Sequence, residues 1–145
     1  MKLIKNKPVT VLFIDTSKDK QLDVFLISAN KIVGKQSLKG NYKVSENLLK
    51  LIDKLLKLNK ITFRQLDAIL VVPGPGPFTS IRIAIAVANT LAYILQIPVI
   101  GIEPIKDRKR LLQLVALMTK DLKNVHTSYL EPIYGSEPNI TKPKK

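Results

Sequence analysis

The chain has 145 residues, of which 46% are hydrophobic and 24% charged, and it contains no cysteine. This length suits one domain with a sizeable core, and the composition is too apolar for an intrinsically disordered protein. The absence of cysteine excludes disulfides and thiolate metal ligands, and we expect a cytoplasmic protein. We expect no membrane span, because no apolar run approaches the ~18 residues that one requires.

The net charge of +13 leaves two interpretations open. Most of the basic residues are lysines scattered along the chain, and aromatic residues make up only 6%, which leaves little surface for stacking bases. The charge can belong to a lysine-rich solvated surface, or it can contribute to RNA affinity.

The N-terminal part predicts three strands. The segment "PVTVLFIDTS" is nearly all apolar and favours a buried central strand, and no small-residue cleavage site follows it, which argues against a signal peptide. Residues 22–28 and 31–37 are typical of two strands joined through Ala29-Asn30 in a β-hairpin.

Helices alternate with short strands in the rest of the chain. Apolar residues recur at helical spacing from Val44 to Leu58, and Asn59 is a plausible stop. A strand over 67–72 ends at Pro73, a second helix covers 78–96, and a short strand covers 97–102. A third helix is expected from Ile105 to about 122, followed by an extended tail. This order predicts an α/β fold whose mixed sheet starts with three antiparallel strands and continues with parallel strands, with helices on its faces.

The first two helices carry more apolar surface than one sheet can cover. The apolar arc of the second helix spans roughly 200° and that of the first roughly 180°, whereas a helix on one sheet face needs a stripe only a little wider than ~100°. The excess favours a protein partner, and the alternative is burial between the sheet and the third helix. The candidate interface residues are Leu48, Leu51, Ile52, Leu55, Ile81, Ile85, Ala88 and Ala92.

The segment 73–77 alternates proline and glycine before the second helix. Every second backbone donor is missing and no Lys-Ser/Thr pair follows, so this is not a Walker-type phosphate loop. The free amides at the helix start still allow an anion site. Its candidate residues are Asp15, Thr16, Gly74, Gly76, Thr79 and Arg82.

No catalytic or metal centre is predicted. Only Asp15 lies at the exit of a strand, which is too few acids for a two-metal site. The single histidine, His126, has no ligand partners, and no second histidine can serve as base for Ser17 or Ser80.

Several segments, among them "VLFIDTS", "LDAILVVPGPGPFTSIRIAIAVANTLA" and "IPVIGIEPI", resemble the N-terminal half of the TsaB (YeaZ) family in order and spacing, over about residues 9–105. The most specific stretch is "GPGPFTSIRI", where the family usually reads Gly-Pro-Gly-Ser-Phe-Thr-Gly-Leu-Arg-Ile. The matching residues are Gly74, Pro75, Gly76, Phe78, Thr79, Arg82 and Ile83.

The resemblance implies an actin-like (ASKHA) fold with a ribonuclease-H-like N-terminal lobe at 1–103, followed at 104–145 by a remnant helix and tail in the same compact unit. It implies a non-catalytic subunit that binds the TsaD catalyst and, with TsaE, supports threonylcarbamoyl transfer to the tRNA adenosine beside the anticodon. The family's dimer interface uses the first two long helices, which would account for the apolar excess. The chain would contact tRNA only indirectly, through the complex. A homodimer is a further possible assembly. ATP or ADP is expected only at a partner interface.

The chain departs from the family pattern at Pro77, where Ser is usual, at Ser80, where Gly is usual, and at Val44, which is often His. Most of the second lobe is missing, so we expect an internally shortened member. Two other functions stay open. One is a basic RNA-binding module whose affinity falls steeply with salt. The other is a small nucleotide-binding ATPase with Asp15 and the 74–80 turn as its site.

Overall fold

The computed structural model describes residues 8–120, 122 and 129–132. Within them the elements follow the predicted order, with one short 3₁₀ turn added. They are β1 (Thr10–Asp15), β2 (Gln21–Ser28), β3 (Lys31–Lys39), α1 (Val44–Leu58), η1 (Phe63–Gln65), β4 (Ala68–Val71), α2 (Phe78–Leu95), β5 (Val99–Gly101) and α3 (Arg108–Thr119).

The five strands form one mixed sheet in the order β3-β2-β1-β4-β5. β1 and β2 pair antiparallel, as do β2 and β3, whereas β4 runs parallel to β1 and to β5. At the hairpin between β2 and β3, Ala29 and Asn30 have positive φ angles of 52° and 61°, which is the sign that a type I′ turn requires at both central positions. The predicted antiparallel start and parallel continuation are therefore confirmed.

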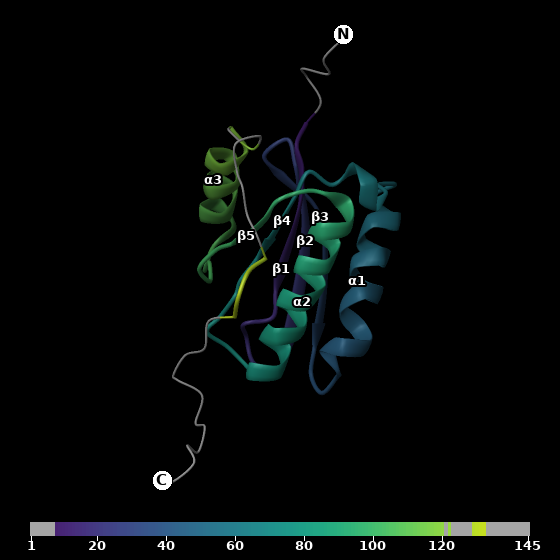
Figure 1. Ribbon diagram of the computed structural model, residues 1–145, viewed down its shortest axis with the longest axis vertical. Coiled ribbons are helices and arrows are strands. Elements are labelled where there is room, and N and C mark those ends of the chain that lie inside the picture. Colours follow the sequence, from purple (N-terminus) through teal and green to yellow (C-terminus); the bar gives the residue numbers. More distant parts are fainter. Residues whose placement is uncertain (1–7, 121, 123–128, 133–145) are drawn as a thin grey trace.

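Helices cover both faces of this sheet (Figure 1). α1 and α2 lie side by side on one face, where they pack on Leu12 and Ile14 of β1. α3 lies on the other face, where its Leu111 packs with Val11 and Phe13 of the same strand. Successive side chains of a strand point to opposite faces, so β1 is buried along its whole length. The alternative in which the third helix buries the first two is therefore wrong.

The helix ends follow local capping. α1 ends at Leu58 as predicted, and the side-chain amide of Asn59 donates to the carbonyl of Leu55 at 2.8 Å. α3 begins at Arg108 and not at Ile105, because the carboxylate of Asp107 accepts from the Arg110 amide at 2.8 Å and so caps the helix there.

α2 corrects the expectation that no stretch reaches the length of a membrane span. It is 18 residues long with Arg82 as its one charge, so its length and composition alone would allow it to cross a bilayer. In the fold, however, Ile81, Ala84 and Ala88 are fully buried against the sheet and α1. Only 28% of the helix is buried in the fold, so α2 has one side in the core and its other side at the surface.

The described part of the C-terminal region contacts the same framework. α3 shares the core beneath the sheet, and residues 129–132 lie beside α2 and β5 (Figure 1). The boundary between 103 and 104 stays a prediction. His126 and the end of the tail lie outside the described residues.

Candidate functional site

The structure corrects the predicted partner interface. Of its eight residues, only Leu51 is partly exposed, and the other seven lie in the core that joins α1 and α2 to the sheet. They are Leu48, Ile52, Leu55, Ile81, Ile85, Ala88 and Ala92. Buried side chains cannot contact a partner while the fold is intact, so the apolar residues that do reach the surface must be sought on the outward sides of the same helices.

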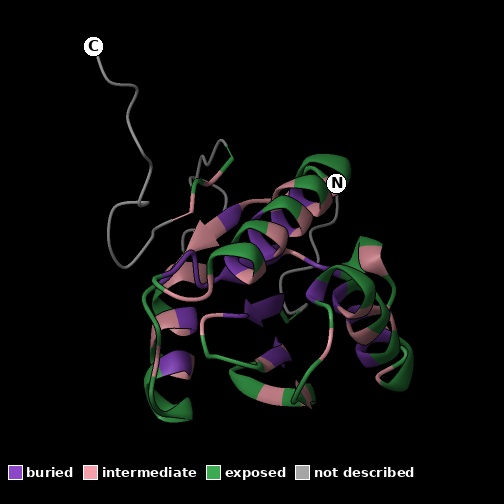
Figure 2. Cartoon of the chain, turned by 90° about the horizontal axis from the view of Figure 1, so that it is seen from below, coloured by how far each residue is buried: buried purple, intermediate pink, exposed green. Residues whose placement is uncertain are grey.

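The outward sides of both helices are exposed (Figure 2), and some of the exposed residues there are apolar. Leu49 of α1 is 51% exposed and Ile94 of α2 is 66% exposed, although both are large hydrophobic residues. On α2, Ala86 is also exposed, and Ile83 and Val87 are half-buried. We call this surface the docking face. Its residues are Leu49, Ile83, Ala86, Val87, Thr90 and Ile94.

Helical spacing places the α2 members of the docking face together. Ile83, Val87 and Ile94 are separated by four and seven residues, so they lie along one side of the helix. Asn89 lies on the opposite flank, because its side chain binds the backbone of Leu130 beside β5. The apolar side of α2 therefore faces away from the flank that holds Leu130.

The predicted anion site is a packed turn. A Cβ on Gly76 would lie 2.7 Å from both the Cα and the carbonyl oxygen of Ser17, so the Pro-Gly segment is in backbone contact with the turn after β1. The hydroxyl of buried Thr16 donates to the carbonyl of Ser80 in the first turn of α2 at 3.1 Å. Glycine at 76 therefore serves close packing, and the space between the two turns is already filled.

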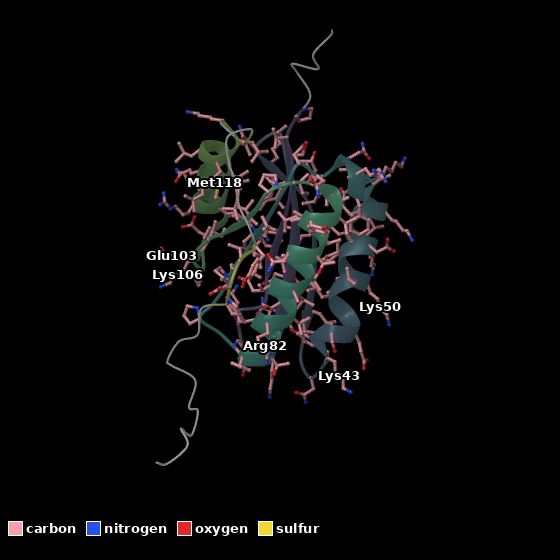
Figure 3. All side chains as sticks on the ribbon, in the orientation of Figure 1. Lys43, Lys50, Arg82, Glu103, Lys106 and Met118 are labelled. Atoms are coloured by element: carbon pink, nitrogen blue, oxygen red, sulfur yellow. The ribbon has the colours of Figure 1, made fainter. Side chains whose placement is uncertain are left out.

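The six anion-site candidates differ in exposure: Asp15, Thr16 and Gly74 are buried, Gly76 packs on the Ser17 backbone, and Thr79 and Arg82 are exposed. Asp15 is buried, and its carboxylate accepts from the amide and the hydroxyl of Ser17 at 2.8 and 2.6 Å. Thr79 and Arg82 are exposed at the start of α2, and the Arg82 guanidinium carbon lies 5.2 Å from the centre of the Phe78 ring. Figure 3 shows Arg82 at that end of the helix, well separated from Lys106 near the start of α3.

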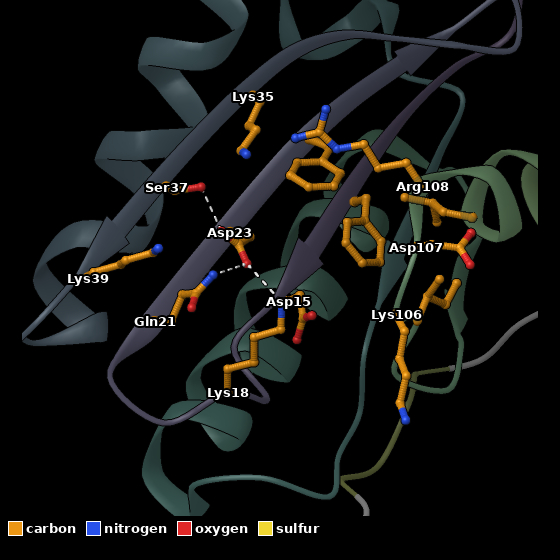
Figure 4. A pocket seen from close by; sticks show the side chains of 14 residues that line it. Asp15, Lys18, Gln21, Asp23, Lys35, Ser37, Lys39, Lys106, Asp107 and Arg108 are labelled. Carbon is orange, nitrogen blue, oxygen red and sulfur yellow. Dashed lines mark hydrogen bonds and ion pairs between the residues drawn. The ribbon is translucent and has the colours of Figure 1, made fainter.

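A second surface lies on the opposite face of the sheet, beside α3. It is a cavity of about 320 Å³ over β1, β2 and β3, closed on one side by residues 105–108 and Leu111 (Figure 4). We call it the basic pocket. Five cationic side chains line it together with the three carboxylates Asp15, Asp23 and Asp107; the cations are Lys18, Lys35, Lys39, Lys106 and Arg108.

Sequence reasoning missed the basic pocket. Every second residue of β3 lies on the same face of the sheet, which groups Lys35, Ser37 and Lys39 there. This grouping could be predicted from the sequence. The position of Arg108 in the pocket could not be predicted from the sequence, because it depends on which face of the sheet α3 covers.

With the fold and both surfaces described, relatives can be compared. A family model described as "TsaD: tRNA N6-adenosine threonylcarbamoyltransferase" matches residues 41–106. The protein named tRNA threonylcarbamoyladenosine biosynthesis protein TsaB in Buchnera aphidicola subsp. Schizaphis graminum (strain Sg) is 37% identical over 94 residues. That alignment covers 63% of this chain and 43% of the relative. TsaB of Bacillus subtilis (strain 168) is 30% identical over 100 residues, which cover 68% and 42% of the two chains.

Solved structures agree with the sequence relatives. YeaZ from Pseudomonas aeruginosa superposes with a TM-score of 0.61 at 32% identity, over 66% of this chain and 44% of that one. The chain belongs to the TsaB/YeaZ family. The mixed sheet accordingly has the actin-like, ribonuclease-H-like fold of YeaZ, and the resemblance inferred from "GPGPFTSIRI" is confirmed.

The match to the family is partial in length. The chain spans between 34% and 56% of the TsaB relatives that it matches. Residues 41–106, which match the TsaD family model, include both helices of the docking face, α1 and α2.

Proposed function

We propose that this chain is a TsaB-like accessory subunit in threonylcarbamoyl modification of tRNA, and that its docking face binds a TsaD-like catalytic subunit. The TsaB relatives are named for tRNA threonylcarbamoyladenosine biosynthesis, which supports the pathway. The proposed site of action is the cytoplasm, where tRNA is modified. A TsaE-like ATPase is the further proposed member of the assembly.

The docking face is the observation that carries the proposal. A contiguous exposed apolar patch often marks an interaction surface, and here the exposed apolar residues lie on the same helices whose other sides form the core. Ala86 and Thr90 are small, so a helix of the partner can approach the α2 backbone closely beside Val87 and Ile94. Leu49 adds a contact from α1, so the partner would rest on both helices.

Among the described residues, no group of three or more acidic, histidine or cysteine side chains could hold a metal ion. Asp15, the acid at the end of β1, is engaged by Ser17. We propose that catalysis belongs to the partner and that any ATP or ADP binds at the partner interface.

Light scattering on the full chain tests the proposal. The chain alone and an equimolar mixture with the TsaD-like protein of the same organism are each passed over a sizing column. The proposal expects a mixed peak with the mass of a heterodimer or of a larger assembly that contains both chains. Separate peaks at micromolar concentration would overturn it, and a chain that only pairs with itself would assign the docking face to a second copy.

A further inference from the structure

We propose that the basic pocket binds the phosphodiester backbone of RNA, so that the chain contacts tRNA directly through the sheet face opposite the docking face. The choice of tRNA rests on the proposed function, whereas the anion chemistry rests on the pocket itself. Three cations carry the argument: Lys35 and Lys39 of β3, and Arg108 at the start of α3.

These three cations have no acidic partner within the described residues. The ion pair that the pocket does contain joins Lys18 to Asp23 at 3.8 Å. Lys35 and Arg108 instead lie over the ring of Phe25, at 5.8 and 5.9 Å from its centre. Figure 4 shows Lys35 and Lys39 entering from the hairpin and Arg108 from the helix. Their charges are therefore available to a ligand.

The carboxylates of the pocket are already occupied. Asp23 is buried and accepts from Ser37 at 2.6 Å and from Gln21 at 2.9 Å. Asp15 accepts from Ser17, and Asp107 caps α3. These hydrogen bonds hold each carboxylate in place. Counted over its whole lining, the pocket is positive, with five cations against three acids.

The geometry suits a chain of phosphates. Lys35 and Lys39 are four residues apart on one face of β3, or about 13 Å at ~3.3 Å per residue, a span that successive backbone phosphates can follow. The Phe25 ring is covered by Lys35 and Arg108, so it offers no free face for stacking a base. Contacts would be made to phosphates, which position an RNA without reading its sequence.

The docking face and the basic pocket do not overlap. The docking face lies on α1 and α2, and the basic pocket lies across the sheet beside α3, so one chain can hold the catalytic partner and the RNA at once. Direct contact would anchor the tRNA to the assembly at a point distinct from the catalytic subunit.

Binding of an unmodified tRNA transcript to the full chain tests the inference, with fluorescence anisotropy measured at several salt concentrations. The pocket variant is Lys35→Gln/Lys39→Gln/Arg108→Gln. The matched control, Lys50→Gln/Lys54→Gln/Arg64→Gln, removes three exposed charges elsewhere. The slope of log affinity against log salt changes by ~0.7–0.9 per phosphate contact. We expect the pocket variant to bind at least about tenfold more weakly and to lose about 2 from this slope, and the control to lose far less.

Each other outcome overturns the inference. Equal weakening in both variants would assign RNA affinity to the lysine-rich surface as a whole. Equal affinity for polyglutamate and tRNA would point to an acidic protein ligand, and no tRNA binding at low salt would exclude the contact. Complex formation with the TsaD-like protein is measured on the same samples. The pocket variant should retain it, so a failure of RNA binding is separable from a failure of the proposed function.

Discussion

The side-chain amide of Asn89 binds the backbone of Leu130 at two points. Its Nδ2 donates to the Leu130 carbonyl at 3.0 Å and its Oδ1 accepts from the Leu130 amide at 2.8 Å. This pairing imitates a neighbouring β-strand, and it attaches the 129–132 segment to the flank of α2. The Leu130 side chain also packs against the α1–α2 core and reaches the space beside Gly101.

Asn89→Ala should release this segment. Two hydrogen bonds, each worth about 1 kcal/mol net, are lost, so the free energy of unfolding in urea should fall by about 1–2 kcal/mol. The Leu130 amide should also exchange faster with solvent. Thr90→Ala, at the exposed neighbouring position, is the control and should change stability by less than about 0.5 kcal/mol. Equal stability of the two variants would show that the pairing contributes nothing.

Gly76→Ala should destabilise the chain by about 1–3 kcal/mol, because the new methyl group would overlap the Ser17 backbone, which cannot move aside as a flexible side chain can. Thermal unfolding of this variant and of Thr79→Ala, an exposed neighbour in the same turn, measures the difference. If both unfold at the wild-type temperature, the two turns do not pack as described.

Ala86 and Ala88 form a matched pair on one helix. Ala88 is fully buried, so Ala88→Arg would place a charge in the core and should prevent folding or cost several kcal/mol. Ala86 is exposed, so Ala86→Arg should leave the unfolding temperature nearly unchanged. Circular dichroism during heating separates the two. A folded, stable Ala88→Arg variant would mean that α2 is rotated relative to this structure.

Tyr42 reports the charge of Asp23. Burial, and then the charges of Asp23 and Asp19, raise the pKa of the Tyr42 phenol above its usual value. The phenol therefore stays protonated to higher pH in the folded than in the unfolded chain, and the stability that this contributes is lost as the pH rises through the folded pKa. Asp23→Asn should lower the pKa of Tyr42. Absorbance titration, with Tyr42→Phe subtracted to isolate this phenol, measures the change, and an unchanged pKa would place the Asp23 charge elsewhere.

Local signals predicted most of the fold. Local sequence was sufficient to predict the turn at Ala29-Asn30 and the helix end at Asn59, because each depends on a few neighbouring residues. Asp107 was missed as a cap, although aspartate is among the preferred residues at that position.

Long-range packing decided what the sequence did not predict. The wide apolar arc of α2 indicated more apolar surface than the sheet can cover. It did not show which side of the arc faces the sheet, so Ile81 and Ala88 were assigned to a partner in error. The basic pocket joins Lys39 to Arg108 across the fold, and no local pattern connects them.

The central claim is that the docking face binds the catalytic partner. The most direct test is the dissociation constant of Ala86→Arg for the TsaD-like protein, measured by calorimetry on a variant that unfolds at the wild-type temperature. Val33→Arg, which alters an exposed apolar residue on β3 away from the docking face, is the control. The account predicts wild-type affinity for Val33→Arg and a loss of at least about a hundredfold for Ala86→Arg, as expected for a charge buried at an interface centre. Wild-type affinity in Ala86→Arg would contradict it.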